Sequence, residues 1–218
     1  MTELSLSARF DAAFAALPLV AILRGLNPAE AEPVAKALYD AGFRLIEVPL
    51  NSPEPFESIA TIRKALPQNA LVGAGTVLAL DNVDRLAAIG ADLVVMPHAD
   101  TAVIRAAKSR SMVCVPGVAT ATEAFAALAA GADALKLFPA EQIAPPIVKA
   151  LRAVIPHSVR LLPVGGITPD TMQPYRAAGA AGFGLGSALY SPGLPVTEVA
   201  ARAARFAEAW AGGTGGVG

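Results

Sequence analysis

A short sequence phrase that recurs four times constrains the fold of this chain more than any other feature. In each copy a small or apolar residue and a glycine lead into an apolar run, and the four copies are AGFRLIEVP at Gly42, IGADLVVMP at Gly90, AGADALKLFP at Gly131 and AGAAGFGLG at Gly179. The glycines lie 48, 41 and 48 residues apart, which is about twice the length of one strand-and-helix unit. Each phrase is typical of a glycine that ends a helix and is followed by a buried strand.

Four further apolar runs alternate with these phrases, and they are Leu19–Leu23, Leu71–Gly75, Met112–Val115 and Leu161–Val164. Segments of helical composition separate the eight runs, and several of them open with proline or an acidic residue. These segments are Pro28–Ala41, Pro53–Ala65, Asp81–Ile89, Asp100–Ser109, Thr122–Ala129, Ile143–Ala153, Pro169–Ala178 and Val196–Trp210. One more helix is expected ahead of the first run, over Ser7–Leu17. The pattern therefore predicts eight strands that alternate with eight helices.

Continuous apolar strands joined by helices predict a parallel sheet that is covered on its faces. The even number of strands in 218 residues favours closure into a (β/α)8 TIM barrel, with an extra helix at the N-terminus. An open doubly wound sheet is the alternative, but the first strand is followed by Leu23–Asn27 (LRGLN) and not by the Gly-x-Gly-x-x-Gly turn of dinucleotide-binding sheets. We expect one barrel domain over residues 1–211 and a disordered glycine-rich tail over residues 212–218.

The composition of the chain limits the kinds of molecule that the protein is expected to bind. Hydrophobic residues make up 54% of the chain and charged residues 16%, which excludes a disordered protein. Seventeen basic and 18 acidic residues leave a formal net charge of -1, so there is no basic surface for nucleic acid or an anionic membrane. We therefore expect a small-molecule partner, with no nucleic acid and no membrane involved.

The reactive side chains are few. Cys114 is the only cysteine, which excludes an intramolecular disulfide, and two histidines argue against a zinc site. The first residues do not read as a secretory signal, and the charge-free stretch 177–197 is interrupted by glycines and prolines. These features predict a cytoplasmic protein without a bound metal.

Three charged residues interrupt or close the predicted apolar strands, and they are Arg24, Glu47 and Lys136. Burial of a lysine lowers its pKa toward the range of an amine nucleophile, so Lys136 is a candidate catalytic residue. The alternatives are a structural ion pair or a lysine whose ammonium group reaches water. Arg24 closes the first strand and suits a carboxylate or phosphate, although a surface ion pair explains it equally well.

Glu47 is a candidate for proton transfer. It lies on the second predicted strand and Lys136 lies on the sixth, so the two strands are opposite each other in an eight-stranded ring. A glutamate whose pKa is raised by burial can abstract and deliver a proton. An internal salt bridge between Glu47 and Lys136 is the alternative.

The last two predicted strands end in glycines that suit a phosphate site. Gly165 and Gly166 follow the seventh strand, and Gly186 and Ser187 follow the eighth. Glycine lets a phosphate approach backbone amides, and barrels often bind phosphate at these two strands. Tight turns also need glycine and remain the alternative. Thr76 closes the third strand, either as a ligand for a substrate oxygen or as a helix cap.

Taken together, the motifs resemble the pyruvate-dependent class I aldolases for 2-keto-3-deoxy-6-phospho sugar acids. The similar segments run in collinear order from about Leu17 to Trp210, and they are VAILRG at Val20–Gly25, IEVPLNSP at Ile46–Pro53, VGAGTVL at Val72–Leu78, PGVATATEAF at Pro116–Phe125, ALKLFP at Ala134–Pro139, PVGGITP at Pro163–Pro169 and GLGSALY at Gly184–Tyr190.

This resemblance implies a role for each candidate residue. Lys136 occupies the position of the Schiff-base lysine and Glu47 that of the proton-transferring glutamate. The family's substrate contacts fall on Arg24, Thr76, Gly166, Gly186 and Ser187. The resemblance also implies a homotrimer that works without a cofactor or a metal on a phosphorylated keto-deoxy sugar acid.

Two positions indicate the 6-phosphogalactonate branch of the family. The 6-phosphogluconate aldolases usually carry arginine in a TLRT phrase and threonine in a PTGG phrase, where this chain has Asn51 in PLNS and Val164 in PVGG. Activity on the gluconate epimer is the alternative, because the two substrates differ at one hydroxyl-bearing carbon. A sugar-phosphate isomerase or epimerase, and a binding protein without activity, are alternatives of other classes.

Overall fold

The computed structural model describes residues 4–212, and its strands form two parallel sheets. The first sheet has six strands in the order β5-β4-β3-β2-β1-β9, and the second has three in the order β6-β7-β8. The strands are β1 (Leu19–Ile22), β2 (Leu45–Pro49), β3 (Leu71–Gly75), β4 (Leu93–Val95), β5 (Val113–Val115), β6 (Gly117–Val118), β7 (Leu135–Leu137), β8 (Leu161–Pro163) and β9 (Phe183–Leu185).

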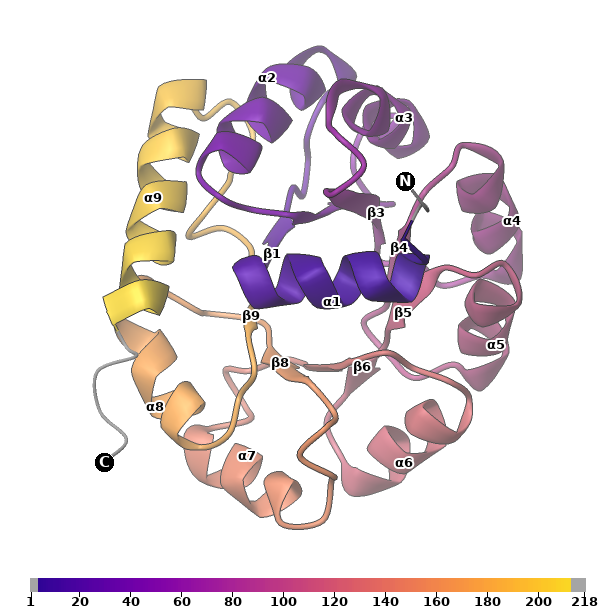
Figure 1. Cartoon of the computed structure of the whole chain (residues 1–218), viewed down its shortest axis with the longest axis vertical. Helices are drawn as coiled ribbons and strands as arrows, with labels where there is room; N and C mark the ends of the chain where they lie inside the picture. The colour runs from indigo at the N-terminus through magenta and orange to yellow at the C-terminus, as the bar shows by residue number, and fades with distance from the viewer. Residues whose placement is uncertain (1–3, 213–218) are drawn as a thin grey trace.

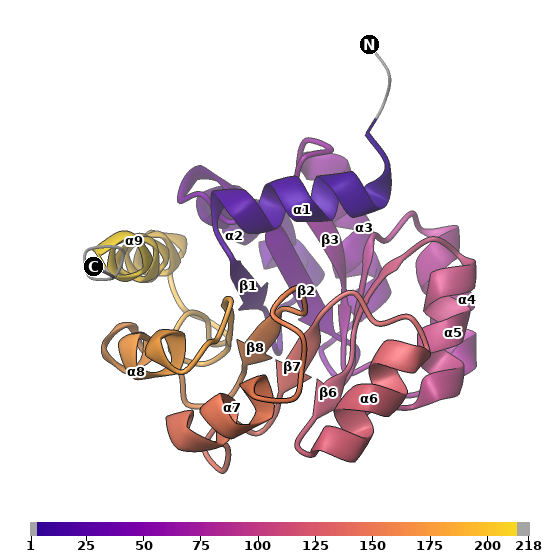
Figure 2. The same ribbon diagram turned by 60° about the horizontal axis from the view of Figure 1, so that its bottom comes forward.

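Helices surround these sheets on the outside, and α1 lies across one end of the strands (Figures 1 and 2). They are α1 (Leu6–Ala16), α2 (Pro28–Asp40), α3 (Pro55–Ala65), α4 (Leu80–Ala88), α5 (Thr101–Ser109), α6 (Ala121–Ala129), α7 (Pro145–Arg152), the 3-10 turn η1 (Pro169–Thr171), α8 (Met172–Ala177) and α9 (Val196–Gly212). The order confirms the leading helix and the alternation of strands and helices, except that β6 is an additional strand that follows β5 with no helix between them. Gly212 ends α9, and the rest of the predicted tail, residues 213–218, lies outside the described residues.

The prediction of one closed (β/α)8 barrel is wrong, because the described strands divide into a six-stranded and a three-stranded sheet. One division falls at Pro116, which lies between β5 and β6 and has no N–H to continue a ladder. At the other division β8 ends at Pro163, and a single bridge between Val164 and Gly184 is the only ladder pairing toward β9 among residues 4–212. Pro163 lies within the predicted strand Leu161–Val164 and Pro116 directly follows the predicted strand Met112–Val115, so the apolar pattern does not reveal either division.

The four glycines of the repeated phrase end helices as predicted. Their φ angles are 99° at Gly42, 70° at Gly90, 103° at Gly131 and 101° at Gly179, in the left-handed region that favours glycine. After α2, the Gly42 N–H donates to the Tyr39 carbonyl and the Phe43 N–H to the Leu38 carbonyl, both at 3.0 Å. This pair of hydrogen bonds is the Schellman motif, which turns the chain directly into the next strand.

The strands are buried along their whole length, and a distinct apolar cluster fills the space between the sheets. Phe10 and Phe14 of α1 belong to that cluster, so α1 covers the end at which the strands begin. Asp92, which precedes β4, fastens α1 through an ion pair of 2.9 Å with Arg9, and it also pairs with Arg63 of α3 at 2.7 Å. The opposite end, where the strands finish, is therefore the end available for a site.

Candidate active site

Glu47 and Lys136 face the same internal space from the two different sheets. Glu47 is on β2 and Lys136 on β7, and their exposed fractions are only 1% and 6%. Both side chains line a small cavity of about 10 Å³, together with apolar residues such as Val95 and Leu162. A volume of this size is near the lower limit for one water molecule. The structure thus brings together the two charged residues that the sequence singled out.

Burial shifts the pKa of each group in the direction that favours its neutral form. The pKa of Glu47 is raised by desolvation, which the charges of Lys136 and Arg24 oppose. The pKa of Lys136 is lowered, first by desolvation and further by Arg24, while Glu47 opposes the shift. The Lys136 Nζ also lies 4.7 Å from the centroid of the Phe138 ring, a contact that favours the charged amine. A neutral amine is consequently more accessible here than on an exposed lysine.

Gly75 makes room for the Glu47 carboxylate. It is the last residue of β3, and a Cβ atom added to it would lie 1.3 Å from Glu47 Oε2. No side chain fits there unless the glutamate moves. Gly75 was not predicted as a site residue, although glycine within a strand signals a close approach of this kind.

A larger cavity of about 670 Å³ opens above Lys136, at the carboxyl ends of the strands. Its lining includes most of the predicted ligands, namely Arg24, Val164, Gly165, Gly166, Gly186 and Ser187. A site at the carboxyl ends of parallel strands is the usual place for ligands in α/β proteins. The two glycine segments therefore lie on one cavity with the lysine.

The remaining predicted residues lie outside that lining. Asn51 is exposed, and its Oδ1 accepts a hydrogen bond of 2.8 Å from Arg24 Nη1, so it orients the arginine. Thr76 is half-buried after β3, with a φ of 54° that is costly for a β-branched residue. It does not cap α4, whose N-cap is Ala79.

Phe138 and Glu141 are among the side chains of the large cavity that were not predicted from the sequence. Phe138 was within reach of the sequence pattern, because residues two apart along an extended chain point to the same side, as Lys136 and Phe138 do. Glu141 carried no comparable signal, because its position depends on the distant Gly165 and Gly166.

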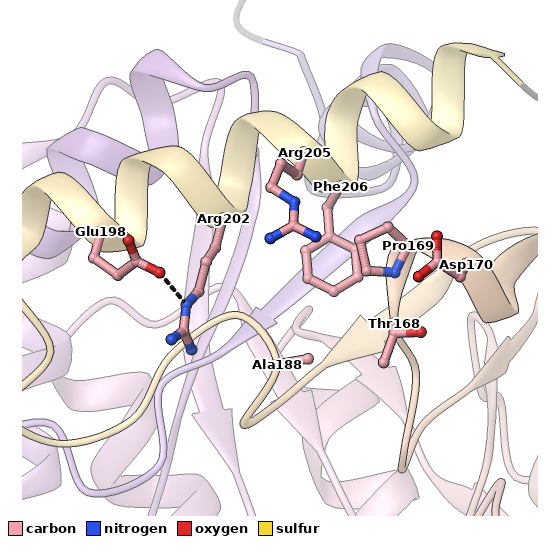
Figure 3. Close-up of a pocket in the computed structure, with 8 residues that line it drawn as sticks. All are labelled: Thr168, Pro169, Asp170, Ala188, Glu198, Arg202, Arg205 and Phe206. Atoms are coloured by element: carbon pink, nitrogen blue, oxygen red, sulfur yellow. Dashed lines mark hydrogen bonds and ion pairs between the residues drawn. The ribbon is translucent and has the colours of Figure 1, made fainter.

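A second cavity of about 320 Å³ adjoins the first and shares Thr168 and Ala188 with it. Figure 3 shows Arg202 and Arg205 of α9 on one side of this cavity and Thr168 of the opposite loop on the other. Arg202 forms an ion pair of 2.8 Å with Glu198 and donates to the Ser187 carbonyl at 3.4 Å. It thereby links α9 to the loop that follows β9.

Residues 4–212 contain neither a cluster of metal-binding side chains nor a membrane-spanning helix. Within them no group of three or more His, Cys, Asp and Glu side chains is placed to hold a metal ion. None of their helices is both long and apolar enough to cross a membrane.

Fold and site together define an α/β protein with a buried amine and a buried carboxyl group on one cavity between its parallel strands. The chain belongs to the KDPG and KHG aldolase family, whose family model matches residues 10–203.

Two curated relatives carry the same enzyme name. The chain is 51% identical over 186 residues to the "Probable 2-dehydro-3-deoxy-6-phosphogalactonate aldolase" of Rhizobium meliloti (strain 1021), covering 85% of this chain and 88% of the relative. It is 49% identical over 194 residues to the "2-dehydro-3-deoxy-6-phosphogalactonate aldolase" of Escherichia coli (strain K12), covering 89% and 95%.

Solved structures agree with these matches. A structure described as "Native KDPGal structure" superposes with a TM-score of 0.89 at 48% identity, covering 90% of this chain and 96% of that one. A "cube-shaped, highly porous protein cage designed by fusing symmetric oligomeric domains" has the same TM-score and identity over 90% and 73%. A KDPG aldolase from Legionella pneumophila "with pyruvate captured at low pH as a covalent carbinolamine intermediate" has a TM-score of 0.75 at 26% identity over 94% and 96%.

Proposed function

We propose that the protein is a class I aldolase that cleaves 2-dehydro-3-deoxy-6-phospho-D-galactonate to pyruvate and D-glyceraldehyde 3-phosphate. The observation that carries this proposal is the placement of Lys136, an amine with a lowered pKa that shares a small cavity with Glu47 and reaches the large one. The names of the two relatives at about half identity support the substrate, and the captured carbinolamine of the Legionella enzyme supports a covalent route.

The first half of the reaction forms the covalent intermediate. The neutral amine of Lys136 attacks the C2 ketone, and the resulting carbinolamine loses water to give an iminium ion. Glu47, acting through a water molecule, takes the proton of the C4 hydroxyl. The C3–C4 bond breaks, its electron pair moves to the iminium to form an enamine, and glyceraldehyde 3-phosphate leaves.

The second half returns the enzyme to its starting state. The proton held by Glu47 is delivered to C3 of the enamine, which regenerates an iminium ion. Water then adds to C2, and pyruvate leaves as the Lys136 amine is restored. One carboxyl group serves both directions of proton transfer, which suits a glutamate whose pKa burial has raised.

The two charged ends of the substrate need separate ligands. Arg24, held by Asn51, and Thr76 bind the C1 carboxylate in this proposal. The backbone amides around Gly165, Gly166, Gly186 and Ser187 bind the C6 phosphate. The strained φ of Thr76 supports its role, because strain of this kind gathers at binding sites.

Borohydride trapping with pyruvate tests the proposal. The wild-type protein is expected to gain a reduced pyruvyl group on Lys136, measured by intact mass and peptide mapping. Lys136→Arg is expected to gain none, and Lys149→Arg, on the exposed face of α7, serves as the control that still reacts. A wild-type protein that gains no adduct, or gains it on another lysine, contradicts the mechanism.

Preference for the galactonate epimer depends on Asn51 and Val164 in this proposal. Comparing kcat/KM for the galactonate and gluconate substrates tests it, and the paired substitution Asn51→Arg with Val164→Thr is expected to shift the ratio toward gluconate. A wild-type preference for gluconate of about ten-fold or more contradicts this use of the two residues.

The proposal extends to a homotrimer in the cytoplasm. It is supported by the similarity to a cage protein built from symmetric oligomeric domains and by exposed apolar side chains such as Leu78, Leu80 and Phe125. A single, buried cysteine suits a reducing compartment. Light scattering is expected to give three times the chain mass of 22.1 kDa, and a monomer or dimer mass contradicts the trimer.

A further inference from the structure

We propose that Glu141 is a specificity-determining residue that competes with the substrate phosphate for the glycine turn after β8. This inference rests on the proposed function, because it concerns the phosphate end of that site. Glu141 lines the large cavity together with Lys136, Gly165 and Gly166. No role in the reaction described above has been given to it.

The backbone on either side of Glu141 is fixed. The Ala140 N–H donates to the Val164 carbonyl at 2.9 Å, and the Ala140 carbonyl accepts from the Tyr175 hydroxyl at 2.9 Å and from the Ile143 N–H at 3.1 Å. These bonds tie the segment after β7 to the end of β8. Only the side chain of Glu141 is therefore free to change its place.

That side chain lies against both glycines. A Cβ atom added to Gly165 would be 2.2 Å from Glu141 Oε2, and one added to Gly166 would be 3.1 Å from Glu141 Cγ. The Glu141 carboxylate thus occupies the space that side chains on Gly165 and Gly166 would fill. A phosphate that approaches the amides of this turn meets a group that is already there and carries the same sign of charge.

The carboxylate can leave this place. Glu141 is exposed, and within the described part of the chain no hydrogen bond or ion pair holds its side chain. Because the Glu141 carboxylate accepts no hydrogen bond from the described amides of this turn, a phosphate dianion that does accept from them can displace it. Replacing the Glu141 carboxylate by the C1 carboxylate of the substrate exchanges one carboxylate for another, so it gives no gain in charge or in acceptor oxygens. Glu141 thereby favours the orientation that places the phosphate at the turn and the C1 carboxylate at Arg24.

Direct binding of inorganic phosphate tests the competition without relying on catalysis. Glu141→Gln keeps the shape and removes the charge, and Glu208→Gln removes one charge from the exposed end of α9 as a matched control. By titration calorimetry, Glu141→Gln is expected to bind phosphate about three-fold or more tightly than the wild-type protein and Glu208→Gln. Equal or weaker binding by Glu141→Gln overturns the inference.

Kinetics separate competition from a direct contact with the substrate. In Glu141→Gln the KM for the phosphorylated substrate is expected to fall, while the KM for the same keto acid without phosphate stays within error of the wild type. If Glu141 instead accepts a hydrogen bond from a substrate hydroxyl, both KM values rise, and the inference is overturned. Failure of the proposed function is a different result, because wild-type protein would then gain no pyruvyl group on Lys136 whatever its affinity for phosphate.

Discussion

The clearest dependence between two residues of the site is that of Glu47 on Gly75. A methyl group on Gly75 cannot coexist with the glutamate, whose Oε2 would be 1.3 Å away. We expect Gly75→Ala to displace the carboxylate and to lower kcat by about a hundred-fold or more, a loss typical of a misplaced proton-transfer group.

A double-mutant cycle checks this explanation. If Gly75→Ala acts through Glu47, it costs little further activity once Glu47→Gln has been introduced. Losses that simply multiply would show that the added methyl group harms the site in another way. Circular dichroism of each variant establishes that the fold is retained.

The charges around Lys136 predict two opposite pH shifts. Arg24 lowers the pKa of Lys136 and Glu47 raises it. Removing the positive charge by Arg24→Met therefore raises the lysine pKa, and removing the negative charge by Glu47→Gln lowers it. The neutral amine is the reactive form, so the trapping rate increases as the pH rises through the lysine pKa. The midpoint of this increase is expected at higher pH in Arg24→Met and at lower pH in Glu47→Gln.

Borohydride trapping of pyruvate measured across pH checks both shifts without the later proton transfers. Shifts in the same direction, or none, would contradict the assigned couplings. The Lys149→Arg variant, which leaves both neighbours of Lys136 in place, provides the reference profile.

Much of the site could be predicted at the residue scale, because a charged residue within an apolar run is conspicuous. Glu47 and Lys136 were found in this way, and the structure places them on one cavity. Gly75 and Glu141 were not, because their importance comes from contacts with residues that are distant in the chain. A sequence pattern indicates the periodicity of helices and strands, but it does not indicate which distant side chain fills a given space.

At the scale of the elements, one helix end departs from the glycine pattern. After α5 the chain turns at Ser111, which has a φ of 58°, and the Met112 N–H donates to the Ala107 carbonyl at 3.0 Å as in the glycine-ended helices. A residue other than glycine is strained there. We expect Ser111→Gly to raise the free energy of unfolding by about 0.5–1 kcal/mol, measured by urea denaturation.

Gly90→Ala is the matched control for this prediction. Gly90 has a φ of 70° and no atom within 4 Å of an added Cβ, so alanine there adds backbone strain without a clash. We expect it to lower the free energy of unfolding by about 1 kcal/mol. An unchanged or lower stability of Ser111→Gly would show that the serine is not strained.

Element positions followed well from the sequence, and strand pairing did not. The helix expected over Pro28–Ala41 is α2, Pro28–Asp40, because proline at its start and glycine after its end mark both limits. The division into two sheets was missed, because the apolar pattern does not show that the chain pairs with β4 before Pro116 and with β7 after it.

At the scale of the whole molecule, the two ends of the strands differ in role: the end where the strands begin stabilises the fold, and the end where they finish carries the candidate site. Asp92 lies at the end covered by α1, has an exposed side-chain fraction of 9%, and pairs with Arg9 and Arg63. We expect Asp92→Asn to lower the free energy of unfolding by about 2–3 kcal/mol, because two half-buried arginines lose their counter-charge. Its kcat at 25 °C is expected to match the wild type, because the site is at the other end.

Asp11→Asn is the control, because Asp11 is 61% exposed in its pair with Arg160 and contributes at most about 1 kcal/mol. Urea denaturation and steady-state kinetics on the same preparations check both variants. A fall in kcat of Asp92→Asn without loss of stability would show that the two ends are coupled. One cooperative transition in the same experiment would also support the prediction of a single domain over residues 1–211.

The division of the strands into two sheets has a consequence for redesign of the enzyme. Glu47 belongs to one hydrogen-bonded sheet and Lys136 to the other, and apolar side chains such as Val95 and Leu162 fill the space between them. A change of volume in these apolar side chains is expected to alter the distance between the Glu47 carboxyl group and the Lys136 amine without breaking a strand ladder. Libraries of variants restricted to these apolar positions are therefore expected to change which substrate carbon chains the site accepts, while both sheets are retained.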